Sequence, residues 1–417
     1  MKRDTWAVLS ERPFRLLWLA RTTSSIGDAL VPVATSFAVL HIGSASDLGV
    51  VLAVFMGSRT VFIVAGGVWG DRLPRQVVML AADLVRAVTQ AAIAVAFLTH
   101  TIEVWNLVVS SAILGGASAF FGPASTGLLP QLVSPGRIQQ ANALIAVARN
   151  AVDVFGPALS GILVATVGYE IVFALDAASF AGSALFLCAM RLPARIELPR
   201  RRSFVAEVKE GAREILARTW LWSSFVNFAL SNLAMAPYFV LGPLVVQREL
   251  GGAQDWGVMM TAGAVGGIVG GAIALRIRPS RPLLVSFPVM LGVPLQLLAL
   301  VRPLPLPALA VGAALFVFGI VAGNTIWQTV VQQQIPNEKL ARVDALDWMV
   351  SLVFMPLGYV VAGPLAARIG VDRTLVAAAC VGLVAELGIL AVPSVRAVRR
   401  LDAGQDARPA TVGAPAA

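Results

Sequence analysis

Charged side chains are scarce in this sequence. They make up 13% of its 417 residues, whereas a soluble domain carries roughly 25%. Hydrophobic residues account for 58%, and the mean hydropathy is +0.80. So little charge over so long a chain indicates that lipid is the main solvent. The net charge of +9 lies mostly in short stretches between apolar runs, which favours a role in membrane topology over binding of nucleic acid.

The sequence is also poor in residues and motifs that carry catalysis. Its two cysteines, Cys188 and Cys380, fall inside apolar runs, so we assign them to packing and expect neither a disulfide framework nor a metal site. The only histidines, His41 and His100, lie at the edges of such runs. The sequence contains no P-loop, no H-E-x-x-H pair and no G-x-S-x-G. We therefore expect no enzyme, no cofactor and no ATP-driven pump in this chain.

Apolar runs of about 20 residues recur along the chain, and each is long enough to cross a ~30 Å hydrocarbon core as a helix. The runs are continuously apolar and too long for the strands of a membrane barrel. No cleavable signal peptide is evident, so the first run is expected to direct insertion. The sequence predicts an all-α membrane protein. Its twelve transmembrane helices are expected at residues 14–40, 47–69, 76–99, 105–129, 138–166, 170–190, 219–247, 254–275, 282–301, 306–333, 340–366 and 372–393.

Lysine and arginine predict the orientation of these spans. Loops on the side of the termini carry clusters of basic residues, whereas the opposite loops carry only isolated arginines at 248, 302, 368 and 373. Because basic loops stay in the cytoplasm, both termini are expected to be cytoplasmic. The Ala- and Arg-rich, Lys-poor composition favours a bacterial source, and hence the plasma (inner) membrane.

One long polar segment, residues 191–218, divides six spans from six. The predicted organisation is an N-terminal six-helix half (1–190), this basic cytoplasmic linker, a C-terminal half (219–396) and a disordered cytoplasmic tail (397–417). The second part of the linker fits either an amphipathic helix on anionic headgroups or a solvated connection.

The two halves resemble each other in sequence. PQLVSPGRIQQANAL (130–144) aligns without gaps with QQQIPNEKLARVDAL (332–346), an offset of 202 (346 − 144). The same offset places VATVG (164–168) on AARIG (366–370). A duplicated six-helix half is a known transporter layout, so the spans are expected to form two pseudo-repeated halves.

Several ionisable residues lie inside the predicted spans, where a charge costs on the order of several kcal/mol unless it is paired or hydrated. They are Arg21, Asp28, Arg59, Asp83, Arg86, Arg149, Asp153, Asp176 and Glu386. Asp28 is in the middle of the first span, and Arg149 and Asp153 are four residues apart and can pair. We predict that Asp28 or Asp153 carries a proton, with Arg59 and Arg149 as counter-ions that change partner. Ion pairs that only fix helix packing are the alternative, which we favour for Asp83, Arg86 and Asp176.

The turn after the second span resembles motif A of the major facilitator superfamily, G-x-x-x-D-R-x-G-R-[RK]. GVWGDRLPRQ (67–76) differs from this pattern at Pro74 and Gln76. The matching positions are Gly67, Asp71, Arg72 and Arg75. The resemblance implies that this turn is a gate, in which Asp71 meets the positive N-terminal end of a facing helix, span eleven.

A second match lies in span five. GPALSG (156–161) resembles motif C of antiporters, G-P-x-x-G-G, at Gly156, Pro157 and Gly161. A proline there bends the helix, and the small residues let another helix approach closely. In the family the partner is span eight, which here carries overlapping G-x-x-x-G pairs, Gly266/Gly270 and Gly267/Gly271. Generic close packing is the alternative.

Together with FALDAASFAGSALFL and ADLVRA, these motifs resemble the branch of the superfamily that contains enterobactin exporters and macrolide or multidrug efflux pumps, over residues 12–396. The resemblance implies proton-coupled export, by alternating access, of a small amphipathic compound such as a drug, an antibiotic or a siderophore-like metabolite. It also implies that a monomer suffices. An importer or facilitator of a small metabolite in the same fold is the alternative, followed by a membrane protein that does not transport.

By analogy with that family, spans one, four, seven and ten line a central cavity near the midplane. The polar and aromatic residues expected on its wall are Asn227, Asn232, Tyr238, Asn324, Trp327 and Gln328. Walls of this kind, with few fixed charges, suit amphipathic substrates. For Trp327, anchoring at the membrane interface is an equal alternative.

Overall fold

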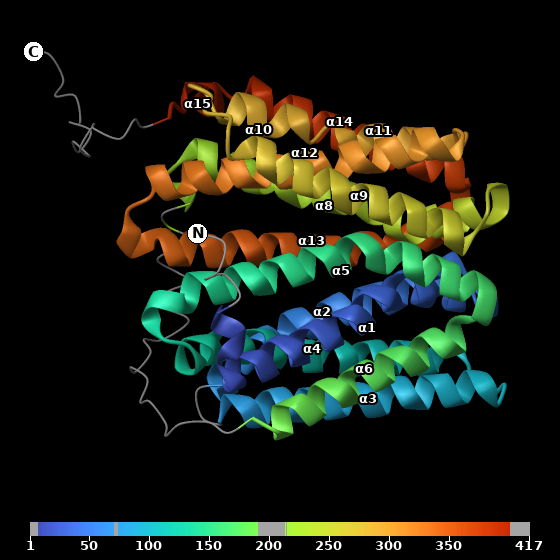
Figure 1. Cartoon of the computed structure of the whole chain (residues 1–417). Helices are drawn as coiled ribbons and strands as arrows, with labels where there is room; N and C mark the ends of the chain where they lie inside the picture. Colours follow the sequence, from blue (N-terminus) through green and yellow to red (C-terminus); the bar gives the residue numbers. More distant parts are fainter. Residues whose placement is uncertain (1–6, 71–73, 191–212, 214, 401–417) are drawn as a thin grey trace, which may run out of the picture.

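The computed structural model describes residues 7–70, 74–190, 213 and 215–400, and these form a bundle of long helices (Figure 1). The first half comprises η1 (Ala7–Ser10), α1 (Arg12–Ile42), α2 (Ala45–Gly70), α3 (Arg75–Leu98), α4 (Val104–Leu132), η2 (Pro135–Arg137), α5 (Ile138–Val167) and α6 (Tyr169–Cys188). The second half comprises α8 (Thr219–Glu249), α9 (Ala253–Ala274), α10 (Leu283–Val289), α11 (Gly292–Val301), α12 (Leu306–Gln334), α13 (Asn337–Ile369), α14 (Val371–Gly388), η3 (Ile389–Ala391) and α15 (Pro393–Ala397).

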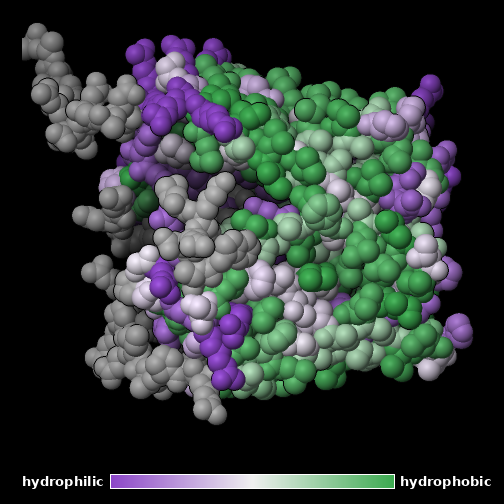
Figure 2. Space-filling model, in the orientation of Figure 1, coloured by the Kyte–Doolittle hydropathy of each residue, from purple (hydrophilic) through white to green (hydrophobic). Residues whose placement is uncertain are grey.

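The all-α membrane fold expected from the sequence is confirmed. Eleven segments of the described chain are long and apolar enough to cross a membrane. The remaining predicted span, the eleventh (340–366), is part of α13, whose described apolar stretch is Val353–Ile369. Figure 2 shows a broad hydrophobic belt with hydrophilic residues gathered at both ends of the bundle. Most of linker 191–218 and the tail from 401 lie outside the described residues.

The ninth predicted span, 282–301, is confirmed as the apolar segment Leu283–Val301, but it is not one continuous helix. The structure divides it into α10 and α11, with Met290 and Leu291 between them. Pro294 has no N–H to donate to the Met290 carbonyl, and its ring clashes with that carbonyl in a regular helix. Because the proline removes this hydrogen bond, the chain changes direction there and continues as a second helix.

The sequence repeat has a structural counterpart. The offset of 202 residues aligns Gly168 with Gly370, and both adopt a left-handed backbone, with φ of 87° and 94°. Each glycine ends a long helix, α5 or α13, and directly precedes the next, α6 or α14. Only glycine takes this conformation without a steric cost, so the duplicated turn depends on it.

The two halves meet mainly through two helix pairs, α5 with α9 and α2 with α13, with smaller contacts of α1 and α2 to α8 and of α1 to α9. One apolar cluster crosses between the halves, joining Val33 and Phe37 of α1 to Tyr238, Trp256 and Tyr359. These side chains lie toward the end of the bundle where α2 and α9 begin and α13 ends, which we call the far end. At the opposite end, where α15 lies (Figure 1), the apolar clusters belong to separate halves. The structure is therefore closed between the halves at the far end.

The GPALSG segment forms this closure. The backbone N–H of Ala158 donates to the Thr261 hydroxyl of α9 across 3.0 Å. A Cβ built at Gly161 would lie 2.5 Å from the Ala253 carbonyl oxygen, and one at Gly257 would lie 2.5 Å from that of Pro157. Small residues on both helices thus permit backbone contact, the property that motif C predicts.

The predicted glycine pairs of α9 do not make this contact. A Cβ at Gly266 or Gly270 would meet backbone atoms of α12, at Ala314 or Phe318, rather than α5. Gly267 and Gly271 also face α12, through Val317 and Val321. The residues that face α5 are Gly257 and Thr261, four positions apart on another side of α9.

Substitution of Gly257 by alanine should open the far end. Its Cβ would be forced against the backbone of α5, and overpacking costs roughly 1–3 kcal/mol. The population of the closed state should therefore fall by about tenfold, measured by distances between spin labels at the far ends of α5 and α9. Gly271→Ala is the matched control, because its Cβ would be 3.5 Å from Val321. A distance distribution for Gly257→Ala that matches wild type would contradict this role.

Candidate functional site

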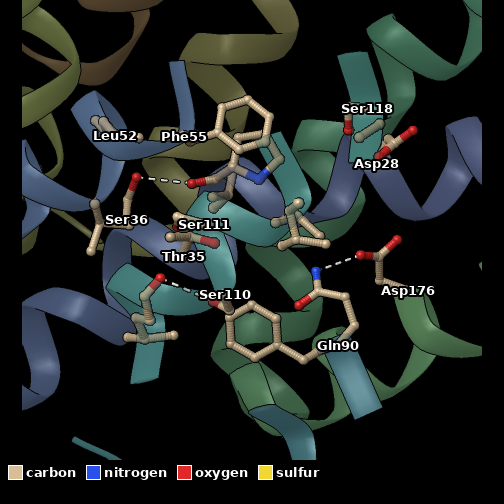
Figure 3. A pocket seen from close by; sticks show the side chains of 18 of the residues that line it. Asp28, Thr35, Ser36, Leu52, Phe55, Gln90, Ser110, Ser111, Ser118 and Asp176 are labelled. Atoms are coloured by element: carbon tan, nitrogen blue, oxygen red, sulfur yellow. Dashed lines mark hydrogen bonds between the residues drawn. The ribbon is translucent and has the colours of Figure 1, made fainter. Parts of the chain in front are cut away.

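A cavity of about 480 Å³ lies between the helices of the first half and opens against the second. Four residues of α8, α9 and α13 complete its wall, Phe239, Trp256, Met260 and Tyr359. Its volume falls within the range of small-molecule sites. The polar side chains that line it come from α1, α2, α3, α4 and α6, and are Asp28, Thr35, Ser36, Arg59, Arg86, Gln90, Ser110, Ser111, Ser118 and Asp176 (Figure 3).

Helix α1 is continuous past this cavity but lacks one backbone hydrogen bond there. Pro32 is inside the helix and has no N–H to donate to the Asp28 carbonyl, four residues earlier. The Ser36 hydroxyl donates to the Pro32 carbonyl at 2.8 Å. The Asp28 side chain faces the cavity, and 52% of it is accessible.

Arg86 of α3 is the centre of a buried charge cluster. Its guanidinium pairs with Asp83, one turn earlier, and lies 3.5 Å from the Asp28 carboxylate. The Asp83 carboxylate also accepts a hydrogen bond of 2.6 Å from the Ser183 hydroxyl of α6. Asp83 and Arg86 are fully buried, unlike Asp28. Arg86 thus links a buried acid to one that faces the cavity.

Two aromatic rings also lie against the Arg86 guanidinium. Its central carbon lies 4.2 Å from the ring centroid of Phe180 and 4.6 Å from that of Phe121. Such cation–π contacts are strongest when the cation is desolvated, as it is here. The rings come from α6 and α4, so the arginine also ties α3 to its neighbours.

A third acid completes the cluster. The Gln90 amide of α3 donates to the Asp176 carboxylate of α6 at 2.5 Å (Figure 3), and both residues are buried. The Ser179 hydroxyl donates to the Asp176 carbonyl at 2.8 Å. Asp176 therefore lies on the same cavity wall as Asp28 without a basic partner among the described hydrogen bonds and ion pairs.

The cluster contains more acids than bases. Asp28 and Asp83 share one buried guanidinium, that of Arg86, and Asp176 accepts from the Gln90 amide, while Arg59 is the other base on the cavity wall. Net charge in a low-dielectric region is costly, so such an arrangement is unusual. Of the three acids, Asp28 is the one that faces the cavity most openly.

The predicted charged residues fall in two places. Asp28 and Arg59 lie on this cavity, whereas Arg149 and Asp153 form a separate, exposed pair on α5 with 3.6 Å between Nε and Oδ2. The sequence assigned Asp83, Arg86 and Asp176 to packing and missed Gln90. The available signal was their spacing, because 83, 86 and 90 lie on one face of α3.

The predicted substrate-facing residues also divide. Asn232, Asn324 and Gln328 line a second cavity, of about 370 Å³, within the second half. Asn227 is buried one turn before Ser231. Tyr238 and Trp327 lie in the apolar core instead of on a cavity wall or at a membrane interface. Trp327 packs against Trp220, Phe225 and Phe228, and its indole N–H donates to Asp347 at 2.9 Å.

The motif A turn is described only in part. Gly67 lies in α2, and Asp71 and Arg72 lie outside the described residues. Pro74 directly precedes α3, whose first residue, Arg75, donates through its guanidinium to the Gly127 carbonyl of α4. Arg75 therefore joins the turn to its own half.

Removing the Arg86 charge should strongly destabilise the protein. Arg86→Gln leaves Asp83 buried without its cation, and breaking a buried pair costs on the order of 3–5 kcal/mol. We expect a large fall in the apparent melting temperature of the purified protein in detergent. The control is Arg149→Gln, because Arg149 is 71% exposed in its pair and such pairs contribute about 1 kcal/mol or less. Equal melting temperatures for the two variants would contradict this role of Arg86.

Comparison with known proteins supports the superfamily that motifs A and C indicate. A family model described as a transmembrane secretion effector matches residues 3–411. The multidrug efflux pump Tap of Mycolicibacterium fortuitum is 29% identical over 406 residues, covering 94% of this chain and 97% of that protein. Macrolide efflux protein A of Streptococcus pyogenes is 21% identical over 400 residues, covering 93% and 97%.

Solved structures show the same fold. A bacterial homologue of the iron transporter ferroportin, in its inward-facing state, has a TM-score of 0.71 at 16% identity, covering 91% of this chain and 98% of that chain. A bacterial homologue of the human lysosomal transporter Spinster, inward-facing and unoccupied, has a TM-score of 0.68 at 13% identity, covering 95% and 98%. With a family match over nearly its whole length, the chain is a multi-pass membrane transporter, not an enzyme, and belongs to the transmembrane secretion effector family of the major facilitator superfamily.

Proposed function

We propose that this transporter exports small amphipathic compounds in exchange for protons. The observation that carries the proposal is the Asp28–Arg86–Asp83 cluster in the wall of a cavity between the halves. The excess of carboxylates supplies a group that can bind a proton. The apolar side chains of the cavity supply a surface for an amphipathic substrate. The efflux pumps Tap and macrolide efflux protein A, which this chain resembles, support the outward direction.

The cluster suggests how proton and conformation are coupled. With Asp28 ionised, Arg86 is shared between the carboxylates of α1 and α3. When Asp28 is protonated, that attraction is lost and Arg86 pairs with Asp83 alone. Helix α1 is then free to move at Pro32, where one backbone hydrogen bond is already missing. Because α1 also packs against α5, such a movement reaches the closure between α5 and α9.

Orientation completes the proposal. The positive-inside pattern places both termini in the cytoplasm of a bacterial cell. The far end, where the halves are closed, then faces outward, and the cavity is loaded from the cytoplasm. Rocking of the halves, with the α5–α9 contact broken, would release the substrate outside.

Asp28→Asn should abolish proton movement stimulated by a transported drug while the folded protein remains in the membrane. Asparagine keeps the shape of the side chain but neither ionises nor attracts Arg86. The measurement is drug-induced proton flux in everted membrane vesicles, with protein level and melting temperature determined in parallel. Asp153→Asn is the matched control on α5 and should retain most of the flux. Normal coupling in Asp28→Asn would refute Asp28 as the proton carrier.

We also propose that the motif A turn acts as a gate, in which Asp71 contacts the N-terminal end of α13 when the halves close on that side. A carboxylate at a helix N-terminus contributes about 0.3–1 kcal/mol. Asp71→Asn should therefore lower transport by roughly two- to fivefold and leave equilibrium substrate binding unchanged. Transport and binding would be measured on the same vesicle preparation. Transport at the wild-type rate would defeat the gate.

A further inference from the structure

The second half contains a buried acidic cavity that the proposed proton pathway does not use. It lies among α8, α11, α12, α13 and α14, and has a volume of about 370 Å³. Its polar lining consists of Ser231, Asn232, Asn324, Gln328, Asp347 and Glu386. Apolar side chains, including Phe228, Met235 and Met290, form the rest of the wall.

Glu386 of α14 is 1% exposed, and its hydrogen bonds are incomplete. Its Oε1 accepts from the Ser231 hydroxyl of α8 at 2.7 Å, whereas its Oε2 has no hydrogen-bond partner among the described residues. Asn227, one turn before Ser231, is 3% exposed and lies close to the Glu386 carboxylate, but among the described residues neither of its amide atoms reaches hydrogen-bond geometry with a partner. Leaving buried polar atoms unsatisfied costs free energy, so these groups indicate a ligand that is absent from the structure.

Among the described residues that line the cavity, no cation balances Glu386. Among the helices packed against α14, the other acid on the wall is Asp347 of α13, whose carboxylate accepts from the Trp327 indole. The described lining contains no lysine, arginine or histidine. In the sequence, the basic residues of this half lie at or beyond the ends of its apolar spans: Arg248, Arg276, Arg278, Arg281, Arg302, Lys339, Arg342, Arg368, Arg373 and Arg396. The first half is different, because Arg86 there pairs with Asp83 and lies near Asp28.

We propose that this cavity binds the positively charged group of a lipophilic cation, with Glu386 as its counter-ion. The carboxylate supplies charge, the amides of Asn232, Asn324 and Gln328 supply hydrogen bonds, and the Phe228 ring offers a face for the cation. Met235 and Met290 are adaptable partners for an apolar body of variable shape.

The linings of the two cavities come within one helical turn of each other on α8. Met235 lines the cavity of the second half, and Phe239, one turn later, lines the cavity against the first half. An amphipathic cation can therefore place its charged group at Glu386 and its apolar part toward Phe239. The inference rests on the proposed function for its substrate class, but equilibrium binding requires neither proton coupling nor transport.

Two ligands of nearly the same shape test the proposal. Methyltriphenylphosphonium is a lipophilic cation, and triphenylphosphine oxide is its neutral counterpart. The affinity of the purified full-length protein for each is measured by equilibrium dialysis. Wild type should bind the cation about tenfold more tightly than the neutral compound. Glu386→Gln, which keeps the size of the side chain, should weaken cation binding about tenfold and change neutral binding less than about twofold.

Two further variants separate charge from structure. Glu386→Asp keeps the charge and should retain the preference for the cation, and Asp372→Asn, at the other end of α14, should leave both affinities unchanged. Equal affinity of wild type for the two ligands would overturn the proposal whatever the variants do. A parallel loss of both ligands in Glu386→Gln would also overturn it, since that result indicates a structural role. Either result would leave the proton flux through Asp28 intact, so the two proposals fail separately.

Discussion

The first half depends on one buried cation. The Arg86 guanidinium pairs with Asp83, approaches Asp28 and lies against two aromatic rings from neighbouring helices. Its desolvation is offset only while these partners stay in place, because an isolated charge in a low-dielectric interior is costly. The arginine therefore fixes α1, α3, α4 and α6 relative to one another. A change in the charge of Asp28 alters the contacts of Arg86 and so affects the packing of all four helices.

The closure at the far end has a different physical basis. Small residues of α5 and α9 allow backbone contact, and an apolar cluster around Tyr238 and Trp256 covers it. Such a contact can separate and re-form without moving charge through lipid. The Arg86 cluster lies inside the first half and the contact between the halves is apolar, which is the arrangement that the proposed rocking of the halves requires.

The sequence predicted the helices well because span length is set by the thickness of the bilayer. It also found the repeat that ends in Gly168 and Gly370, since that turn requires glycine. It did not predict the break before α11. The span was assigned from the length of the apolar run, and the helix-breaking effect of Pro294 was not considered. The contacts of the Asp83–Arg86 pair could not be predicted from the sequence, since Asp28 and Ser183 come from helices far apart in the chain. Tyr238 and Trp327 were expected on a cavity wall but lie in the apolar core, because the polar atom of an aromatic residue does not by itself indicate a cavity.

Coupling between the charged cluster and the rocking halves is the central claim, and uphill transport tests it most directly. Purified protein would be reconstituted into liposomes with an imposed pH gradient. A fluorescent amphipathic drug would be present at the same concentration inside and outside the liposomes at the start. The account predicts that the drug moves against its own gradient while the pH gradient lasts, and that an ionophore which collapses the pH gradient stops this movement. Equilibration of the drug without uphill movement, or accumulation that survives the ionophore, would contradict it.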